Sequence, residues 1–230
     1  MNETKKPKLL TQNSKMKKSS SAGTLVYNWT IPAFQSVTGL KTCPNAGTCS
    51  AGCYARSGTY RFSNVVSAHE AKLALTLKPE FETNMINEIE GLSAKKGLKK
   101  LYIRIHDAGD FYNAEYLTKW INIIKYFESD EHVTFYAYTK QVELLKSIEL
   151  PDNFKVTFSY GGKQDSLIDK SKDRHASVFE SELELSLAGY VDGTNDDLVA
   201  GKGLDFKIGL VYHGAKSYKN TLWSNKTKGA

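Results

Sequence analysis

Hydrophobic positions follow two alternating patterns along the chain. Short runs of β-branched and aromatic residues predict six strands, at residues 25–34, 101–105, 133–138, 155–159, 187–191 and 207–212. Apolar residues at helical spacing predict a helix pair within residues 63–90, broken at Pro79, and helices at residues 114–127 and 142–148. Alternating strands and helices are typical of a parallel sheet, so we expect an α/β fold, either doubly wound or an incomplete barrel.

Polar and ionisable residues follow each predicted strand. In parallel α/β folds the carboxyl ends of the strands lie at one edge, where ligands bind. We therefore expect the loops at these ends to line one mouth. They are residues 42–55, 106–110, 139–140, 161–165, 192–196 and 213–214.

The first of these loops holds the chain's three cysteines, Cys43, Cys49 and Cys53, among small residues. Three clustered cysteines cannot pair off completely, which favours a metal site in a reducing compartment over disulfides. Three thiolates can hold three irons of a [4Fe-4S] cluster and leave the fourth iron open to a small-molecule ligand. A structural zinc needs a fourth ligand, for which His106 or His213 is available in space. We favour the cluster and keep zinc as the alternative.

Three polar residues follow the second predicted strand. His106 can transfer a proton, and the carboxylates of Asp107 and Asp110 can bind an amine, a hydroxyl or a cation. The alternative for Asp110 is helix capping, although Asn113 is the better cap for the helix at residues 114–127. Lys140 is placed either to meet an anionic group or to lie in solvent. We expect the mouth to be lined further by Tyr138, Ser159, Gly161, Gly162 and His213.

The positive charge is distributed unevenly along the chain. Residues 1–20 carry six lysines against one glutamate, and so hold most of the net charge of +6. A lysine-rich segment with few apolar residues is expected to be mobile, so we predict a disordered basic tail at residues 1–22. Such a tail either solubilises the protein or contacts nucleic-acid phosphates. We expect one domain at residues 23–215 and a polar tail at residues 216–230.

The amino-acid composition is typical of a globular protein. The chain is 40% hydrophobic and 11% aromatic over 230 residues, which is enough for a sizeable core. No apolar run approaches the length of a membrane helix, and no secretory signal opens the chain. We therefore expect a cytoplasmic protein without membrane contact.

Several motifs resemble the phage "gene product 88" family. They are Cys-Pro-x-Ala-Gly-x-Cys-x-x-x-Cys-Tyr-Ala at residues 43–55, Arg-x-His-x-x-Gly-Asp-Phe at 104–111, Tyr-Ala-Tyr-Thr-Lys at 136–140 and Leu-Pro-x-Asn-Phe at 150–154. That family resembles radical S-adenosylmethionine proteins. The resemblance implies a partial, open triosephosphate-isomerase-type barrel of about six mostly parallel strands with outer helices, in a protein of a phage or prophage.

The same resemblance implies a [4Fe-4S] cluster over the mouth and S-adenosylmethionine as its ligand. Catalysis would then be radical chemistry or Lewis-acid activation at the open iron. Here five and three residues separate the cysteines, whereas three and two are usual in radical S-adenosylmethionine proteins, and no Gly-Gly-Glu stretch follows the second strand. The rival hypothesis is a non-catalytic module, stabilised by a cluster or zinc, that binds nucleic acid or a host protein.

Overall fold

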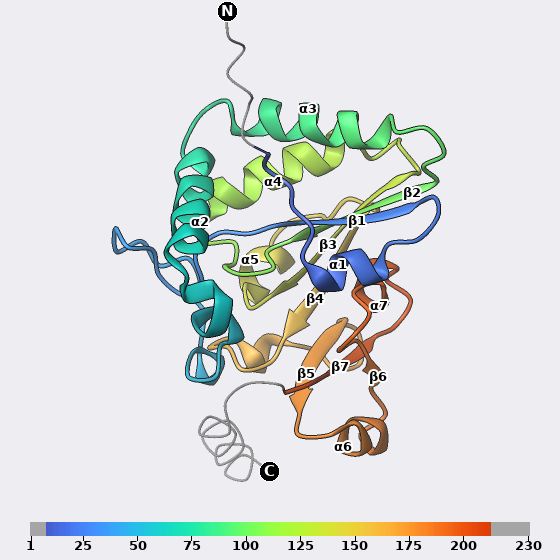
Figure 1. Cartoon of the computed structure of the whole chain (residues 1–230). Coiled ribbons are helices and arrows are strands. Elements are labelled where there is room, and N and C mark those ends of the chain that lie inside the picture. Colours follow the sequence, from blue (N-terminus) through green and yellow to red (C-terminus); the bar gives the residue numbers. More distant parts are fainter. Residues whose placement is uncertain (1–7, 213–230) are drawn as a thin grey trace, which may run out of the picture.

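The computed structural model describes residues 8–212. Its centre is one seven-stranded sheet that curves into an open half-barrel (Figure 1), with strand order β1-β2-β3-β4-β5-β7-β6 and parallel pairing throughout. The expected α/β partial barrel is thus confirmed. The strands are β1 (Thr24–Trp29), β2 (Lys100–Ile105), β3 (Val133–Thr139), β4 (Phe154–Ser159), β5 (His175–Phe179), β6 (Val191–Asp192) and β7 (Lys207–Val211).

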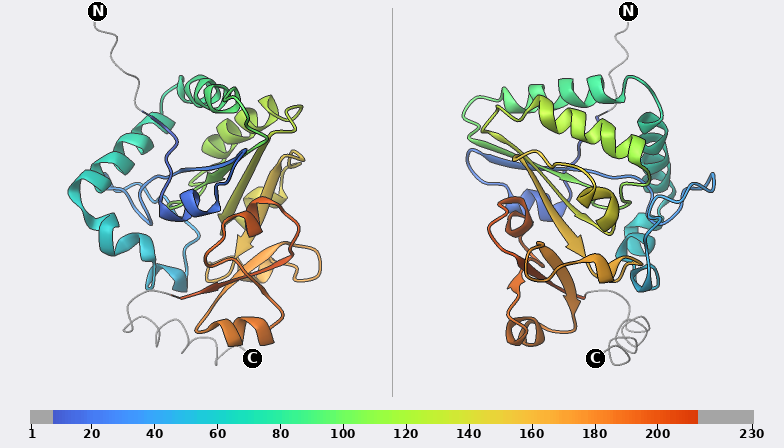
Figure 2. Two further views of the ribbon diagram at one scale, coloured as in Figure 1. Left: turned by 45° about the vertical axis from the view of Figure 1, so that its right-hand side comes forward. Right: turned by 180° about the vertical axis from the view of Figure 1, so that it is seen from behind.

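Helices cover the outer face of the sheet (Figures 1 and 2). They include α2 (Ser63–Thr76), α3 (Phe81–Ser93), α4 (Ala114–Tyr126) and α5 (Val142–Lys146), close to the predicted ranges and with the break at Pro79. The carboxamide oxygen of Asn113 accepts the Tyr116 N–H at 2.8 Å, so Asn113 caps α4 as expected. The apolar face of α4 packs in the main core, where burial of each large side chain contributes about 1.5–3 kcal/mol.

Two short helices lie on the inner, concave face: α1 (Ser14–Ser19) and α7 (Leu198–Gly201). Successive strand residues point to opposite faces, so Ile103 and Ile105 of β2 join the outer core while Arg104 between them points inward. A second, smaller core fills the inner face, and it is formed by Met16, Val26, Tyr136, Ala176, Leu198, Ala200 and Ile208.

The expectation of a mobile tail is wrong for residues 8–22. Leu9, Leu10 and Met16 are buried, and the backbone N–H groups of Leu9 and Leu10 donate to the Glu88 carboxylate at 2.7 and 2.8 Å. These few apolar residues are enough to dock a lysine-rich segment across the sheet. Residues 1–7, His213 and the expected polar tail at residues 216–230 lie outside the described residues.

The strand predicted at residues 187–191 is also wrong. Helix α6 (Glu182–Leu187) occupies its start, because the Ser181 hydroxyl caps the Glu184 N–H, and only the two residues of β6 are extended. The true fifth strand is β5, which the sequence analysis did not predict. None of the helices formed by residues 8–212 is long and apolar enough to cross a membrane.

Candidate functional site

The cysteine loop leaves the carboxyl end of β1 and is fixed at its start. The N–H groups of Thr42 and Cys43 donate to the Phe34 carbonyl oxygen at 3.0 and 3.2 Å, and the Phe34 N–H donates to the Cys43 Sγ at 3.3 Å. From the neighbouring loop after β2, Asp110 donates its N–H to the Thr42 carbonyl at 2.9 Å. The first cysteine is therefore held by two strand ends.

The three thiols are free, partly exposed and close enough to influence one another. Burial raises the pKa of Cys43 to about 12, and the nearby Asp110, Cys53 and Cys49 add to the rise. Burial also raises the pKa of Cys53, as does Cys49, while the Ala55 N–H and Lys140 act against it. At neutral pH, Cys43 and Cys53 therefore stay protonated unless a cation stabilises the thiolates.

The middle of the loop packs against the turn after β4. The N–H groups of Gly47 and Cys49 both donate to the Gly161 carbonyl oxygen at 3.1 Å. Gly161 has a φ of +94°, and a Cβ there would lie 3.2 Å from the Cβ of Cys49. A Cβ on Gly47 would come within 2.9 Å of the Gly161 oxygen. The glycines thus allow two backbones to touch.

Gly161 and Gly162 were predicted to bind a cofactor. In the structure their N–H groups donate to the Asp165 carboxylate, each at 2.8 Å, and an isolated antiparallel bridge joins Gly162 to Ala46. The glycine turn supports the cysteine loop and already uses these two donors. A cofactor-binding role for the two glycines stays a prediction.

Lys140 and Ser159 lie beside the same loop. The ammonium of Lys140 donates to the Ser159 hydroxyl at 3.0 Å and to its carbonyl oxygen at 3.3 Å. Within residues 8–212 no carboxylate forms an ion pair with Lys140. Lys140 therefore brings a positive charge close to Cys53.

Asp110 is buried, and its carboxylate accepts hydrogen bonds from neighbouring backbone and side-chain groups. It accepts the Thr139 hydroxyl at 2.6 Å, the Phe111 N–H at 2.8 Å and the Lys140 N–H at 2.9 Å. Burial raises its pKa, and these hydrogen bonds oppose the rise. Asp110 joins the ends of β2 and β3 beneath Cys43, which is a positioning role.

His106 turns away from the mouth. It has a φ of +68°, its Nε2 lies 3.0 Å from the Tyr116 hydroxyl of α4, and its ring meets Phe111 edge-to-face at 4.6 Å. Burial, together with the positive charge of Arg104, lowers its pKa to about 3, so the imidazole is neutral. Among residues 8–212, the hydrogen-bond partner of His106 is the Tyr116 hydroxyl, so proton transfer by His106 stays a prediction.

Asp107 joins a buried polar network on the inner face. Its carboxylate accepts hydrogen bonds from the Tyr60 hydroxyl at 2.6 Å and from Asn13 at 3.3 Å, and pairs with Arg104 at 3.4 Å. Tyr54 of the cysteine loop donates its hydroxyl to the Asp107 carbonyl oxygen. Asp107 therefore connects the cysteine loop to the N-terminal segment.

Sequence reasoning missed the centre of this network, the ion pair between Arg104 and Asp197. The guanidinium NH1 lies 3.1 and 3.2 Å from the two carboxylate oxygens. Tyr138 lies alongside, with the Arg104 guanidinium carbon 5.3 Å from its ring centre. A charged residue in the apolar run Leu-Tyr-Ile-Arg-Ile was the available signal, because such a residue must be paired when buried.

The predicted site residues therefore separate into three groups. Asp110, Lys140, Ser159, Gly161 and Gly162 lie around the three cysteines, Asp107 and Tyr138 belong to the inner-face network, and His106 lies in the aromatic core. Their chemical roles stay predictions.

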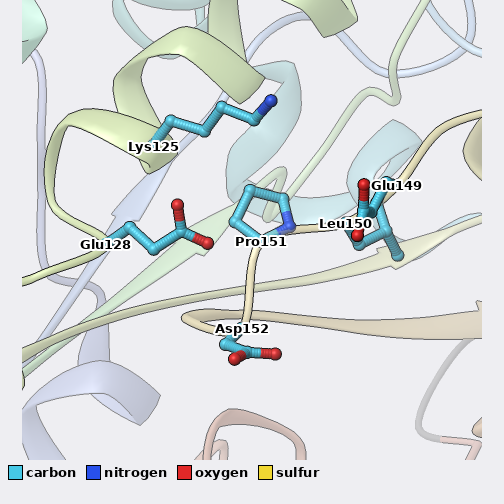
Figure 3. A pocket seen from close by; sticks show the side chains of 6 residues that line it. All are labelled: Lys125, Glu128, Glu149, Leu150, Pro151 and Asp152. Carbon is cyan, nitrogen blue, oxygen red and sulfur yellow. The ribbon is translucent and has the colours of Figure 1, made fainter.

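Two further features bear on ligand binding. Within residues 8–212, no group of three or more His, Cys, Asp and Glu side chains is arranged to hold a metal ion. A surface pocket lies away from the cysteines, at the loops that precede β3 and β4 (Figure 3), and is lined by Lys125, Glu128, Glu149, Leu150, Pro151 and Asp152. It opens at the edge of the sheet opposite to the cysteine loop, so it is not part of the same site.

Comparison with known proteins places the chain in a family. No curated protein and no solved structure matches it. The model of one family, described as Gene product 88, matches residues 4–221 and so covers both the cysteine loop and the inner-face network. The chain belongs to the Gene product 88 family.

Proposed function

We propose that the protein binds a [4Fe-4S] cluster through Cys43, Cys49 and Cys53 and leaves one iron open to a small-molecule ligand. One observation carries the proposal: three cysteines with free, partly exposed thiols lie on one loop, at residues 43–53, at the carboxyl edge of the sheet. Three free thiols on one short loop, two of them with pKa values raised by burial, are suited to binding a cation that stabilises them as thiolates.

The donor set favours a cluster over a single zinc ion. Among the described residues, no three His, Cys, Asp or Glu side chains, the cysteines included, are arranged to hold a single metal ion. Ligands of a single ion must converge on one point, whereas the cysteines of a cluster surround a larger inorganic body and need not converge. Close backbone packing at Gly47 and Gly161 also gives the loop the compact shape that such a body needs.

The chain's own residues would support this site in three ways. Lys140 stabilises negative charge at Cys53 and is free to meet an anionic group of the ligand. Asp110 fixes the loop at Cys43, and the Gly161 carbonyl fixes it at Cys49. A bound cluster with an open iron would supply electron transfer or Lewis-acid activation.

Anaerobic purification tests the proposal. We expect iron and sulfide in equal amounts and broad absorption at about 400 nm from thiolate-to-iron charge transfer. Cys49→Ser should lose most of both, whereas Ser50→Ala on the same loop should keep them. Colourless protein with stoichiometric zinc would refute the proposal.

A second measurement addresses the open iron. Electron paramagnetic resonance of the reduced protein is recorded with and without S-adenosylmethionine. A changed spectrum identifies that molecule as a ligand, and an unchanged one directs the search to other small molecules. If Cys49→Ser unfolds while Ser50→Ala does not, the cluster is chiefly structural, as the non-catalytic alternative requires.

A further inference from the structure

We propose that the inner face of the half-barrel carries a binding site for a primary ammonium group, formed by the Asp197 carboxylate and the Gly193 carbonyl, and that Lys15 occupies it in cis. The Lys15 Nζ lies 2.7 Å from the carboxylate and 2.9 Å from the carbonyl oxygen. The site goes beyond the proposed cluster and does not rest on it, because none of these residues is a cysteine ligand.

The two buried carboxylates of this network require a second cation to balance their charge. The sheet supplies one guanidinium, Arg104, which faces two carboxylates, Asp107 and Asp197. The Asp197 side chain is fully buried and also accepts the Tyr136 hydroxyl at 2.8 Å. Without a further cation the network keeps an excess negative charge, which is costly in a buried place. Among the described residues, Lys15 is the one cation other than Arg104 that pairs with Asp197.

Lys15 is the replaceable member of the network. It comes from α1, a helix of six residues, and its side chain is 26% exposed. A helix of this length has little stability of its own, so its position depends on a few contacts with the sheet. These include Met16, the bond from Asn13 to Asp107 and the bond from Ser19 to Asp196 at 3.0 Å. An ammonium from solution can therefore compete with Lys15.

The site also has hydrogen-bonding capacity that Lys15 leaves unused. The Tyr138 hydroxyl is buried and has no hydrogen-bond partner among residues 8–212. The Tyr138 oxygen lies 3.6 Å from where a Cβ on Gly193 would be, and so borders the carbonyl that holds the ammonium. Buried polar groups in a purely structural ion-pair network are normally satisfied, and the Tyr138 oxygen can accept a hydrogen bond from an ammonium, so it points to such a ligand.

Displacement of Lys15 would also change contacts that connect the N-terminal segment to the cysteine loop. Asn13, two residues before Lys15, and Tyr60, which follows the cysteine loop, bind the same carboxylate oxygen of Asp107. When the N-terminal segment leaves, Asp107 keeps Tyr60 and Arg104 but loses Asn13. Ligand binding on the inner face is thereby linked to the loop that carries the cysteines.

The test uses the full-length chain and n-butylammonium chloride, which has the four-carbon stem of a lysine side chain. Tetramethylammonium chloride at equal concentration is the control for charge and ionic strength, because it cannot donate hydrogen bonds. Calorimetry measures binding to the wild type, to Lys15→Ala and to Lys17→Ala, whose lysine is exposed on the same helix. We expect Lys15→Ala to bind butylammonium at least about tenfold more tightly than the other two, because its competitor is gone.

Hydrogen exchange of the wild type provides the decisive readout. Butylammonium, but not tetramethylammonium, should speed exchange at Met16, Lys17 and Ser20, whose N–H groups are bonded within this segment. Unchanged exchange at a concentration that saturates Lys15→Ala would overturn the proposal and leave a permanent ion pair. Equal affinity of all three proteins would also overturn it. If Lys15→Ala does not fold, the exchange measurement on the wild type decides alone.

Discussion

Cys49 donates its backbone N–H to the carbonyl oxygen of Gly161 over 3.1 Å. This bond joins the loop after β1 to the turn after β4, although β2 and β3 lie between these strands in the sheet. The cysteine loop therefore spans the carboxyl edge of the half-barrel. Its shape depends on backbone at both ends of that span.

Gly161→Ala should destabilise the protein and also lower its iron content. The positive φ of +94° strains any L side chain, and the new Cβ would meet the Cβ of Cys49 at 3.2 Å. We expect a loss of about 1–3 kcal/mol in the free energy of unfolding, measured with urea. Gly189→Ala is the matched control, because Gly189 has a φ of +72° but open space around its Cβ position. It should lose stability through strain and keep its iron, and equal iron loss in both variants would contradict this account.

Lys140→Met should make Cys53 less reactive in metal-free protein. The ammonium of Lys140 lowers the pKa of Cys53 against the effect of burial, so its removal raises that pKa further and reduces the thiolate fraction. Alkylation by iodoacetamide, followed by mass spectrometry at several pH values, should show the rate profile of Cys53 moved to higher pH. Lys163→Met is the control, since the Lys163 side chain binds the loop at the Pro44 carbonyl oxygen, and its backbone bond to the Asn45 carbonyl is kept in the variant. The same profile in both variants would remove Lys140 from the site.

The sequence predicted the repeating part of the fold well. Runs such as Leu-Tyr-Ile-Arg-Ile and the amphipathic spacing of α4 reflect local geometry, which a single segment expresses by itself. β5 was missed because its residues, His-Ala-Ser-Val-Phe, include only one β-branched residue, and it forms by pairing with β4 and β7. Leu187 was predicted to begin a strand, although it is the last residue of the helix that Ser181 caps.

The sequence placed only some of the candidate site residues near one another. Polar residues after parallel strands do lie at one edge, and this rule placed Lys140, Ser159 and the glycine turn beside the cysteines. The φ of +68° at His106 turns its ring into the outer core. No pattern in the sequence predicts that angle. The pairing of Arg104 with Asp197 spans 93 positions and depends on the tertiary fold. Arg104 within an apolar strand signalled only that a partner exists.

Arg104→Met should be strongly destabilising because it leaves Asp107 and Asp197 without their shared guanidinium. Removing one partner of a buried ion pair costs about 3–5 kcal/mol in the free energy of unfolding. The double variant Arg104→Met with Asp197→Asn should recover part of this loss, because it removes one of the unpaired charges. Urea unfolding of the two variants measures the difference. A double variant no more stable than the single one would mean that Arg104 acts mainly through packing on Tyr138.

His106 should make the protein less stable as the pH falls. Its pKa is lowered to about 3 in the folded protein, so in mild acid the imidazole gains a proton only on unfolding. The unfolded state then binds more protons, and stability declines from an unfolded pKa of about 6.5 down toward the folded value. Between pH 7 and pH 5 this group accounts for about 2 kcal/mol of lost unfolding free energy.

His106→Asn isolates this effect, because asparagine tolerates the positive φ and does not titrate. Urea unfolding at pH 7, 6 and 5 should give a flatter pH dependence for His106→Asn than for the wild type. His132→Gln, in which an exposed histidine is replaced, should follow the wild-type curve. Parallel curves for wild type and His106→Asn would mean that the imidazole has the same pKa in the folded and the unfolded protein, which would contradict this account.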